Sequence, residues 1–400
     1  MKARLTIKSG GLFCYDMLTI ADIVDAVAAP YTVWRTLHGL EPEMCEGRPR
    51  FVAGNAAVSF VVRYEERRCM LKCYTRRSDR LSAIYGDAFR PKELCVVDFA
   101  GRYHWVDCLL MEYVEGCTLD EALATATTAE EYAALATAFD SMALDILSSE
   151  RAHGDLKPEN IIVGEDGRMM AIDWDAAFVP AFAGCQALEM GTAAYQHPMR
   201  DMSFYDKHID DYSIAFISTL LHLAAVRPES MSGYALHREP PIHPRELISR
   251  GGWSSTEIHR QIVEEFARRG MAREYQVAML LRSPFVRLAD LEEIFAAERR
   301  DAVDLSDEPT LEFDSKGRWG VQVAGEWILP PLYTSSIGIS EGVALLGLGA
   351  YRHFVRLSDG VVLASFDEES NVGPLHDGCT TLCTADGHSR IIRVVVDKFD

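Results

Sequence analysis

The order in which two hydrophobic patterns follow each other limits what this chain can fold into. Between residues 49 and 113 apolar side chains alternate with polar ones, which predicts four or five antiparallel strands. From residue 130 onward apolar side chains recur every three or four positions, which predicts helices over 130–149, 211–225, 256–267 and 288–297. A β-rich part followed by a helical part is typical of an α+β protein. Ligands favour the crevice between two such parts.

Both ends of the chain differ from this central part. Residues 1–45 form an N-terminal extension in this interpretation, with a strand over 4–7 and a helix over 19–28. The acidic residues 299–310 predict a linker, and residues 311–400 return to a β pattern. In that last part glycines stand at positions 325, 342, 360 and 378, and equivalent positions lie about 35 residues apart. The spacing predicts an internal repeat.

The charge of the chain narrows its possible partners. Forty Lys and Arg residues against sixty Asp and Glu give a formal net charge of −20, which argues against nucleic acid or an anionic membrane as the main partner. The longest apolar stretch, residues 217–226, is about half the ~20 residues that a membrane span needs. A signal peptide is not expected because Asp16, Asp22 and Asp25 interrupt the segment that would be its core. We therefore expect a cytoplasmic protein with reduced cysteines.

The densest polar cluster runs from His153 to Asn160 and is followed by an apolar strand pattern. Thirteen residues beyond Asn160 comes Asp173, again after apolar residues. A strand, a turn and a second strand between them would bring Asp155, Asn160 and Asp173 to one end of a hairpin. One carboxylate and one amide oxygen suit Mg²⁺ on nucleotide phosphates, because this ion keeps several positions for water and substrate. A second carboxylate can align an acceptor hydroxyl, and Lys157 can neutralise charge on a transferred group.

This cluster resembles the catalytic loop of the eukaryotic-type protein kinases. The segment HGDLKPEN, residues 153–160, matches the signature of that family except at Gly154, where Arg is usual. Further matches follow in the family's order over about residues 50–298. The resemblance implies a bilobal protein-kinase-like domain over residues 46–298, with a β-rich and a helical lobe, that uses ATP with Mg²⁺ or Mn²⁺.

The resemblance also implies a role for individual residues. Lys72 would grip the α- and β-phosphates, Met111 would be the gatekeeper, and the backbone from Glu112 to Val114 would face adenine. The complete implied ATP-binding set is Gly54, Met70, Lys72, Met111, Glu112, Val114 and Ile162. In the catalytic loop, Asp155 would orient the acceptor hydroxyl, Lys157 would neutralise the γ-phosphoryl charge, Asn160 and Asp173 would hold the metal, and His153 and Asp210 would support the loop. Thr192 together with Lys157 favours Ser/Thr acceptors over Tyr.

Several departures from the family pattern concern the ATP side. The glycine-rich loop is reduced to Gly54, so the backbone approaches phosphates less freely. Met70 stands where Ala is usual and would narrow the adenine pocket. The helix Glu that should pair with Lys72 is not evident, and Glu93 is our candidate, with Asp87 behind it.

Other departures concern the activation segment. Asp173-Trp174-Asp175 replaces Asp-Phe-Gly, which should make the turn less able to flip because an L-residue resists positive φ. Between Asp173 and Pro198 the only hydroxyl residues are Thr192 and Tyr195, and Gly154 removes the arginine that would bind an activation-loop phosphate. We therefore expect an enzyme that is not switched on by phosphorylation there. Met199 replaces the final Glu of the segment.

Residues 311–400 resemble the WG-repeat domains of bacterial proteins. The resemblance rests on Lys316 to Val321, on Trp327 to Pro331 and on Glu341-Gly342. It implies a β-rich module that binds a protein partner or regulates the chain. Plain structural packing is the alternative.

Three functions remain open at this point. The favoured one is a Ser/Thr protein kinase, because Lys157-Pro158-Glu159 and the segment from Gly191 to Pro198 resemble a peptide-binding arrangement. The second is a small-molecule phosphotransferase like the aminoglycoside and choline kinases, in which His-Gly-Asp and Ile-Asp-Trp-Asp also occur. The third is a pseudokinase scaffold that acts through residues 311–400, which the retained metal and base residues disfavour.

Overall fold

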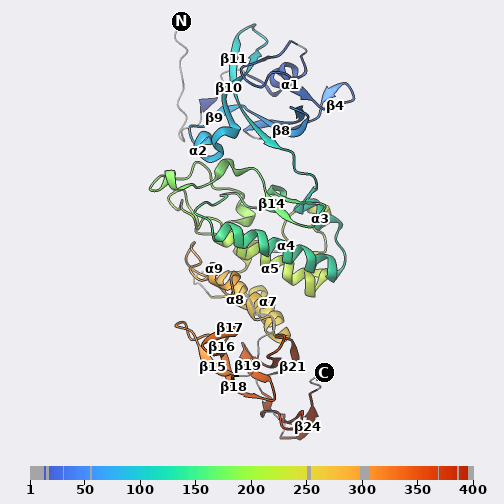
Figure 1. Ribbon diagram of the computed structural model, residues 1–400, viewed down its shortest axis with the longest axis vertical. Helices are drawn as coiled ribbons and strands as arrows, with labels where there is room; N and C mark the ends of the chain where they lie inside the picture. Colours follow the sequence, from blue (N-terminus) through green and yellow to red (C-terminus); the bar gives the residue numbers. More distant parts are fainter. Residues whose placement is uncertain are drawn as a thin grey trace.

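A computed structural model of the chain describes residues 13–14, 18–29, 31–54, 56–249, 254–297, 307–367, 369–384 and 387–394. Three regions follow one another along the long axis: an antiparallel sheet with two helices, a group of helices, and a set of small sheets (Figure 1). The expected mixture of sheet and helix, with strands before helices, is confirmed. The strand expected over residues 4–7 and most of the acidic linker, residues 299–306, lie outside the described residues.

The first region is a seven-stranded antiparallel sheet with the order β2-β10-β11-β8-β7-β3, and β6 pairs with β7. Its strands are β2 (Val33–Trp34), β3 (Glu41–Pro42), β6 (Phe51–Ala53), β7 (Ala57–Tyr64), β8 (Arg67–Tyr74), β10 (Phe89–Val97) and β11 (Tyr103–Glu112). Alternation along β7 buries Val58, Phe60 and Val62 completely on one face. Strand β8 is central and places Lys72 between its neighbours β7 and β11. Two short pairs flank the sheet: β1 (Phe13–Cys14) with β9 (Arg76–Arg77), and β4 (Met44–Cys45) with β5 (Arg48–Pro49).

Helix α1 (Ile20–Ala28) packs on the buried face of this sheet. Thr19 and Asp22 form a capping box at its start, and Ile23 and Val27 share one hydrophobic core with Phe60 of β7. The helix expected over 19–28 is thus confirmed. Strands β2 and β3 also belong to the main sheet, and residues of α1 share its hydrophobic core.

The second region is helical. It contains α3 (Leu119–Thr125), α4 (Ala129–Leu147), α5 (Asp211–Val226), α6 (Tyr234–His237), α7 (Glu257–Arg269), α8 (Ala272–Leu280) and α9 (Leu291–Phe295), while α2 (Leu81–Tyr85) lies beside the sheet. Helices α4 and α5 lie side by side at its centre (Figure 1), and α5 is buried along nearly its whole length. All four predicted helices are present. The sequence missed α3, α6 and α8, of which α3 and α6 are too short to display a helical period.

A small sheet connects the two regions. Strands β12 (Cys117–Thr118), β13 (Ile161–Val163) and β14 (Met169–Ala171) pair in that order, and all are antiparallel. The hairpin β13–β14 is the one expected between Asn160 and Asp173, so both residues stand at its open end.

The third region consists of three small antiparallel sheets. Their strands are β15 (Thr310–Phe313), β16 (Trp319–Val323) and β17 (Glu326–Tyr333); β18 (Ser335–Ser340), β19 (Val343–Leu348), β20 (Tyr351–Arg356) and β21 (Val362–Asp367); and β22 (Asn371–Val372), β23 (Cys379–Cys383) and β24 (Ser389–Arg393). Gly342 and Gly378 each follow another residue with positive φ in a two-residue turn, as hairpins with a type I′ turn require. The Glu341 carboxylate accepts hydrogen bonds from the backbone N–H groups of Asp377 and Gly378, so these two equivalent turns are in contact.

The third region packs directly against the helices. Gln276 of α8 donates to the carbonyl of Leu332 at 2.6 Å, and Lys316 Nζ lies 2.7 Å from an oxygen of Asp290. The hydrophobic core of the helices continues into β16, β17 and β19. Within the described part of the chain, none of the helices combines the length and the apolar character that crossing a membrane demands.

Candidate active site

Residues 153–160 form a loop that is fixed from below by a buried carboxylate. Asp210 is 1% exposed, and it accepts hydrogen bonds from the backbone N–H groups of His153 and, at 2.9 Å, of Gly154. Burial raises the pKa of Asp210, whereas His153 and these backbone donors act in the opposite direction. On the other side of the loop, His153 Nε2 lies 2.7 Å from the carbonyl oxygen of Ile172, directly before Asp173. The loop and the end of β14 are therefore held in one arrangement.

The imidazole of His153 has a defined tautomer in this arrangement. Its Nδ1 accepts a hydrogen bond from the backbone N–H of Asp155, so the proton must be on Nε2, which donates to Ile172. The Trp174 ring lies 4.9 Å from the imidazole, centre to centre, and its Nε1 donates to the carbonyl of Ala171. These contacts leave His153 no access to a substrate, and it acts on the loop alone.

Asp155 is surrounded by the polar groups of its own loop. Asn160 Nδ2 lies 2.9 Å from the Asp155 carbonyl oxygen and 3.5 Å from its carboxylate, and Lys157 Nζ lies 3.7 Å from Asp155 Oδ2. Thr192 contacts the same carboxylate through its backbone N–H, at 2.5 Å. Asp155, Lys157, Asn160 and Thr192 are thus neighbours.

Asp173 stands opposite this loop and is paired with Lys72. Its Oδ1 lies 2.5 Å from Lys72 Nζ, and the Lys72 side chain is only 11% exposed. The backbone of Asp173 is in the left-handed region, with φ 64° and ψ 56°, which is uncommon for a residue other than glycine. The Ile172 N–H donates to the Asn160 carbonyl at 2.8 Å, which ties this turn to the catalytic loop. Strain of this kind is retained where surrounding contacts fix it.

The donor atoms fit a divalent cation that is only partly ligated by protein. The Asn160 amide nitrogen is used by the Asp155 carbonyl, which leaves its amide oxygen as a potential metal ligand, and the Ile172 N–H on the Asn160 carbonyl ties this residue to the turn of Asp173. Among the described residues no three His, Cys, Asp or Glu side chains are grouped as ligands of one metal ion. Two oxygen donors of this kind match Mg²⁺, which usually keeps several waters, and do not match a closed structural zinc site.

The residues expected around adenine lie on β8, β11 and β13. Met70 of β8 stands directly opposite Met111 of β11, and Ile162 of β13 is half-buried. The Tyr113 N–H donates to the Arg68 carbonyl, so by the alternation of an antiparallel ladder the backbone groups of Glu112 point away from β8. By the same alternation, Val114 is the next residue whose backbone groups point away from β8.

Gly54 occupies a tight turn between β6 and β7. Its N–H donates to the carbonyl of Ala57 at 2.8 Å, and its φ is not positive. The N–H is therefore already used, and the turn makes no use of the freedom of glycine. The structure gives Gly54 no feature that a phosphate-binding glycine would need.

The expected pairing of Glu93 with Lys72 is wrong. Glu93 lies within strand β10, not on a helix, and it is 1% exposed. Its carboxylate accepts hydrogen bonds from the backbone N–H groups of Thr36 and Leu37 and from the Thr36 hydroxyl, at 2.7–2.8 Å. It therefore anchors the segment after β2. The short helix α2 carries no acidic residue at all.

Asp175 is the second partner of Lys72, and the sequence motifs gave it no role. Asp175 Oδ2 lies 2.7 Å from Lys72 Nζ, and its Oδ1 accepts hydrogen bonds from the hydroxyls of Tyr74 and Tyr85. Burial lowers the pKa of Lys72, but the charges of Asp175 and Asp173 outweigh burial and raise that pKa overall. The Asp-Trp-Asp spacing was the only signal of this contact in the sequence.

Glu189 and Arg200 are two further charged neighbours that the sequence analysis missed. Removal from bulk water raises the pKa of Glu189, and the negative charges of Asp155, Asp175 and Asp173 raise it further. Arg200 is 6% exposed, and its guanidinium donates to the Gly154 carbonyl at 3.1 Å. Neither residue belongs to a motif that the sequence analysis used, and so no pattern pointed to them.

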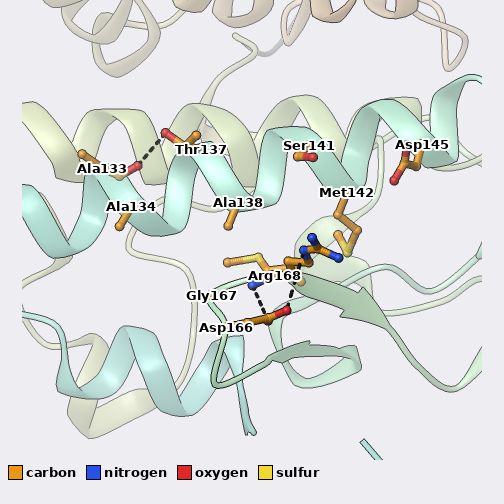
Figure 2. A pocket seen from close by; sticks show the side chains of 11 residues that line it. Ala133, Ala134, Thr137, Ala138, Ser141, Met142, Asp145, Asp166, Gly167 and Arg168 are labelled. Atoms are coloured by element: carbon orange, nitrogen blue, oxygen red, sulfur yellow. Dashed lines mark hydrogen bonds and ion pairs between the residues drawn. The ribbon is translucent and has the colours of Figure 1, made fainter. Parts of the chain in front are cut away.

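A separate cavity of about 580 Å³ lies between α4 and the turn after β13 (Figure 2). Small side chains of α4, such as Ala134 and Ala138, form one wall, and the turn from Asp166 to Arg168 forms another. Because neither Lys72 nor Asp173 lines it, this cavity is not the candidate active site.

Comparison with known proteins agrees with this geometry. The family of ABC1 atypical kinase-like domains matches residues 102–178, which include β11, the catalytic loop and Asp173. Residues 102–178 are therefore similar to part of a kinase-like domain. A probable serine/threonine-protein kinase of Bifidobacterium longum is 34% identical over 106 residues. That match covers 24% of this chain and only 14% of the relative.

Proposed function

We propose that the chain is an ATP- and Mg²⁺-dependent phosphotransferase, and more specifically a serine/threonine protein kinase. The observation that carries this proposal is the meeting of Lys72 with Asp173 beside the loop that holds Asp155 and Asn160. In this proposal, residues 46–298 are a bilobal protein-kinase-like domain and bind ATP between the sheet and the helices. Residues 311–400 are a WG-repeat-like module that binds a protein partner.

The proposed mechanism assigns one task to each polar group. Lys72 binds the α- and β-phosphates, and Asn160 and Asp173 would hold Mg²⁺ or Mn²⁺, which neutralises phosphate charge when bound. Asp155 aligns the acceptor hydroxyl and takes its proton as the acceptor oxygen bonds to the γ-phosphorus. The bond from that phosphorus to the bridging oxygen breaks, and ADP leaves. Lys157, 3.7 Å from Asp155, neutralises charge on the transferred group.

The environment of Asp155 supports a hydroxyl acceptor on a protein. Thr192 holds Oδ1 of Asp155 through its backbone N–H, whereas Oδ2 has only the longer contacts with Asn160 at 3.5 Å and Lys157 at 3.7 Å and is the oxygen that would take the acceptor hydroxyl. Tyr195, in the same segment, is 3% exposed. A kinase cannot phosphorylate a buried hydroxyl, so the burial of Tyr195 supports the part of the proposal that excludes regulation by phosphorylation at Tyr195. A large rise in activity after phosphorylation of Thr192 or Tyr195 would contradict that part of the proposal.

The test is transfer of radiolabelled γ-phosphate to three kinds of acceptor: a generic protein such as casein, the chain itself, and a panel of aminoglycosides and amino alcohols. We expect label on serine and threonine of the protein acceptors, and no label after Asp155→Asn. Label on the small molecules alone would replace the protein kinase by a small-molecule phosphotransferase. Absence of label from every acceptor would contradict both.

A further inference from the structure

We propose that Asp175 is the positioning residue that holds Lys72 in place for the nucleotide, in a chain whose helix α2 supplies no carboxylate for that purpose. This inference rests on the proposed function. It concerns a residue that touches neither the acceptor nor the transferred group and acts through Lys72.

The ammonium group of Lys72 lies between two carboxylates, 2.5 Å from Asp173 and 2.7 Å from Asp175. The Asp175 side chain is 20% exposed, whereas that of Asp173 is 47% exposed. Solvent screens a less exposed charge more weakly, so Asp175 keeps more of its attraction to Lys72 than Asp173 does. When Asp173 is engaged by a metal ion, Asp175 still anchors Lys72.

Asp175 is itself fixed by two hydroxyl groups. Tyr74 follows Lys72 by two positions on β8 and so points to the same side of the sheet. Its hydroxyl donates to Asp175 Oδ1 at 2.9 Å, and that of Tyr85 donates to the same oxygen at 2.7 Å. Burial raises the pKa of both tyrosines, so both stay protonated and remain donors. With Oδ2 bonded to Lys72, the carboxylate cannot rotate without losing a bond.

Helix α2 carries Tyr85 as its last residue. Arg151 donates to the carbonyl of Ile84 at 3.0 Å, and Arg80 donates to the carbonyl of Gln186 at 2.7 Å. Both bonds join α2 to the helical region. Tyr85 therefore has a fixed distance to Asp175, and α2 contributes to the Lys72 site through a phenol where a carboxylate is missing.

The experiment compares the affinities of ADP and adenosine by isothermal titration calorimetry with Mg²⁺ present. Lys72 contacts phosphates, so Asp175→Asn should weaken ADP binding about tenfold and leave adenosine binding unchanged, because it removes one charge-assisted bond. Tyr85→Phe should weaken ADP binding by a smaller factor in the same direction. Asp145→Asn, on the exposed side of α4, is the matched control and should bind both ligands like the wild type.

The outcomes separate this inference from the proposed function. Equal ADP affinity in wild type and Asp175→Asn would overturn the inference, as would an equal loss for ADP and adenosine, which indicates a general structural role. If the wild type binds neither ligand, the proposed function itself fails. In the transfer assay, Asp175→Asn should raise KM for ATP and leave KM for the acceptor unchanged, and an unchanged KM for ATP would contradict the positioning role.

Discussion

Gly154 and the carbonyl of Ala176 are in such close contact that a Cβ atom at position 154 would overlap the Ala176 oxygen. Gly154 also has a φ of +85°, a conformation that side chains rarely adopt. The glycine that distinguishes this catalytic loop from the usual protein-kinase signature is therefore a requirement of the backbone. An arginine could not occupy this position without movement of the segment after Asp173.

Replacement of Gly154 tests this contact. Gly154→Ala should lower the free energy of unfolding by about 3 kcal/mol and reduce phosphate transfer, because both the backbone conformation and the overlap oppose it. The matched control is Gly184→Ala, since Gly184 has a φ of +81° and open space around its Cβ position. Urea denaturation of both variants measures the difference. Equal losses would show that φ alone matters and that the contact does not.

Arg200 provides a second test of the loop. Its buried guanidinium bonds the Gly154 carbonyl and the side chain of Gln196. Arg200→Lys keeps the charge but cannot reproduce the planar donor group, so we expect a loss of about 2 kcal/mol in unfolding free energy and slower phosphate transfer. Arg168→Lys, at a position whose side chain is 90% exposed, should change neither quantity. Wild-type behaviour of Arg200→Lys would remove Arg200 from the account of the loop.

His353 makes the stability of the third region depend on pH. It is completely buried next to Gly270 of the helical region, and burial lowers its pKa to about 4. The pKa of His353 in the unfolded chain is about 6.5. At pH values between that pKa and the lower pKa in the folded chain, the unfolded chain binds a proton that the folded chain does not. Stability should therefore fall as pH falls, by about 2 kcal/mol from pH 7 to pH 5.

Urea denaturation of wild type and His353→Gln at the two pH values measures this effect. His353→Gln should be less dependent on pH than the wild type. The matched control His376→Gln, at an exposed histidine of the same region, should keep the wild-type dependence. An identical pH dependence in wild type and His353→Gln would contradict the burial of a neutral imidazole.

The sequence predicted those parts of the structure that depend on local patterns. The period of two in β7 and the period of three to four in α4 and α5 were long enough to be recognised, and the β13–β14 hairpin followed from its apolar and turn residues. The contacts that were predicted wrongly or not predicted at all join segments that are distant in the sequence. Glu93 is separated by 57 residues from Thr36, and Asp175 by 90 from Tyr85, so no local pattern encodes either partner.

The N-terminal residues illustrate the same limit. The helix α1 was predicted from its own period, but its packing on the sheet was not, because that depends on which strands expose an apolar face to it. In the third region, Gly342 and Gly378 occupy turn positions with positive φ, which a glycine pattern in the sequence can indicate, whereas the internal repeat stays a prediction.

Binding of ATP with and without Mg²⁺ tests the central claim, that Lys72, Asn160 and Asp173 form one metal–nucleotide site. With Mg²⁺ present and ATP at about one hundred times its Kd, the wild type should melt about 5 °C higher than it does without ligand. Asp173→Asn should lose most of this rise, because it removes the charged metal ligand, while the exposed control Asp166→Asn should keep it. A wild-type melting temperature that does not respond to ATP and Mg²⁺ would contradict the claim.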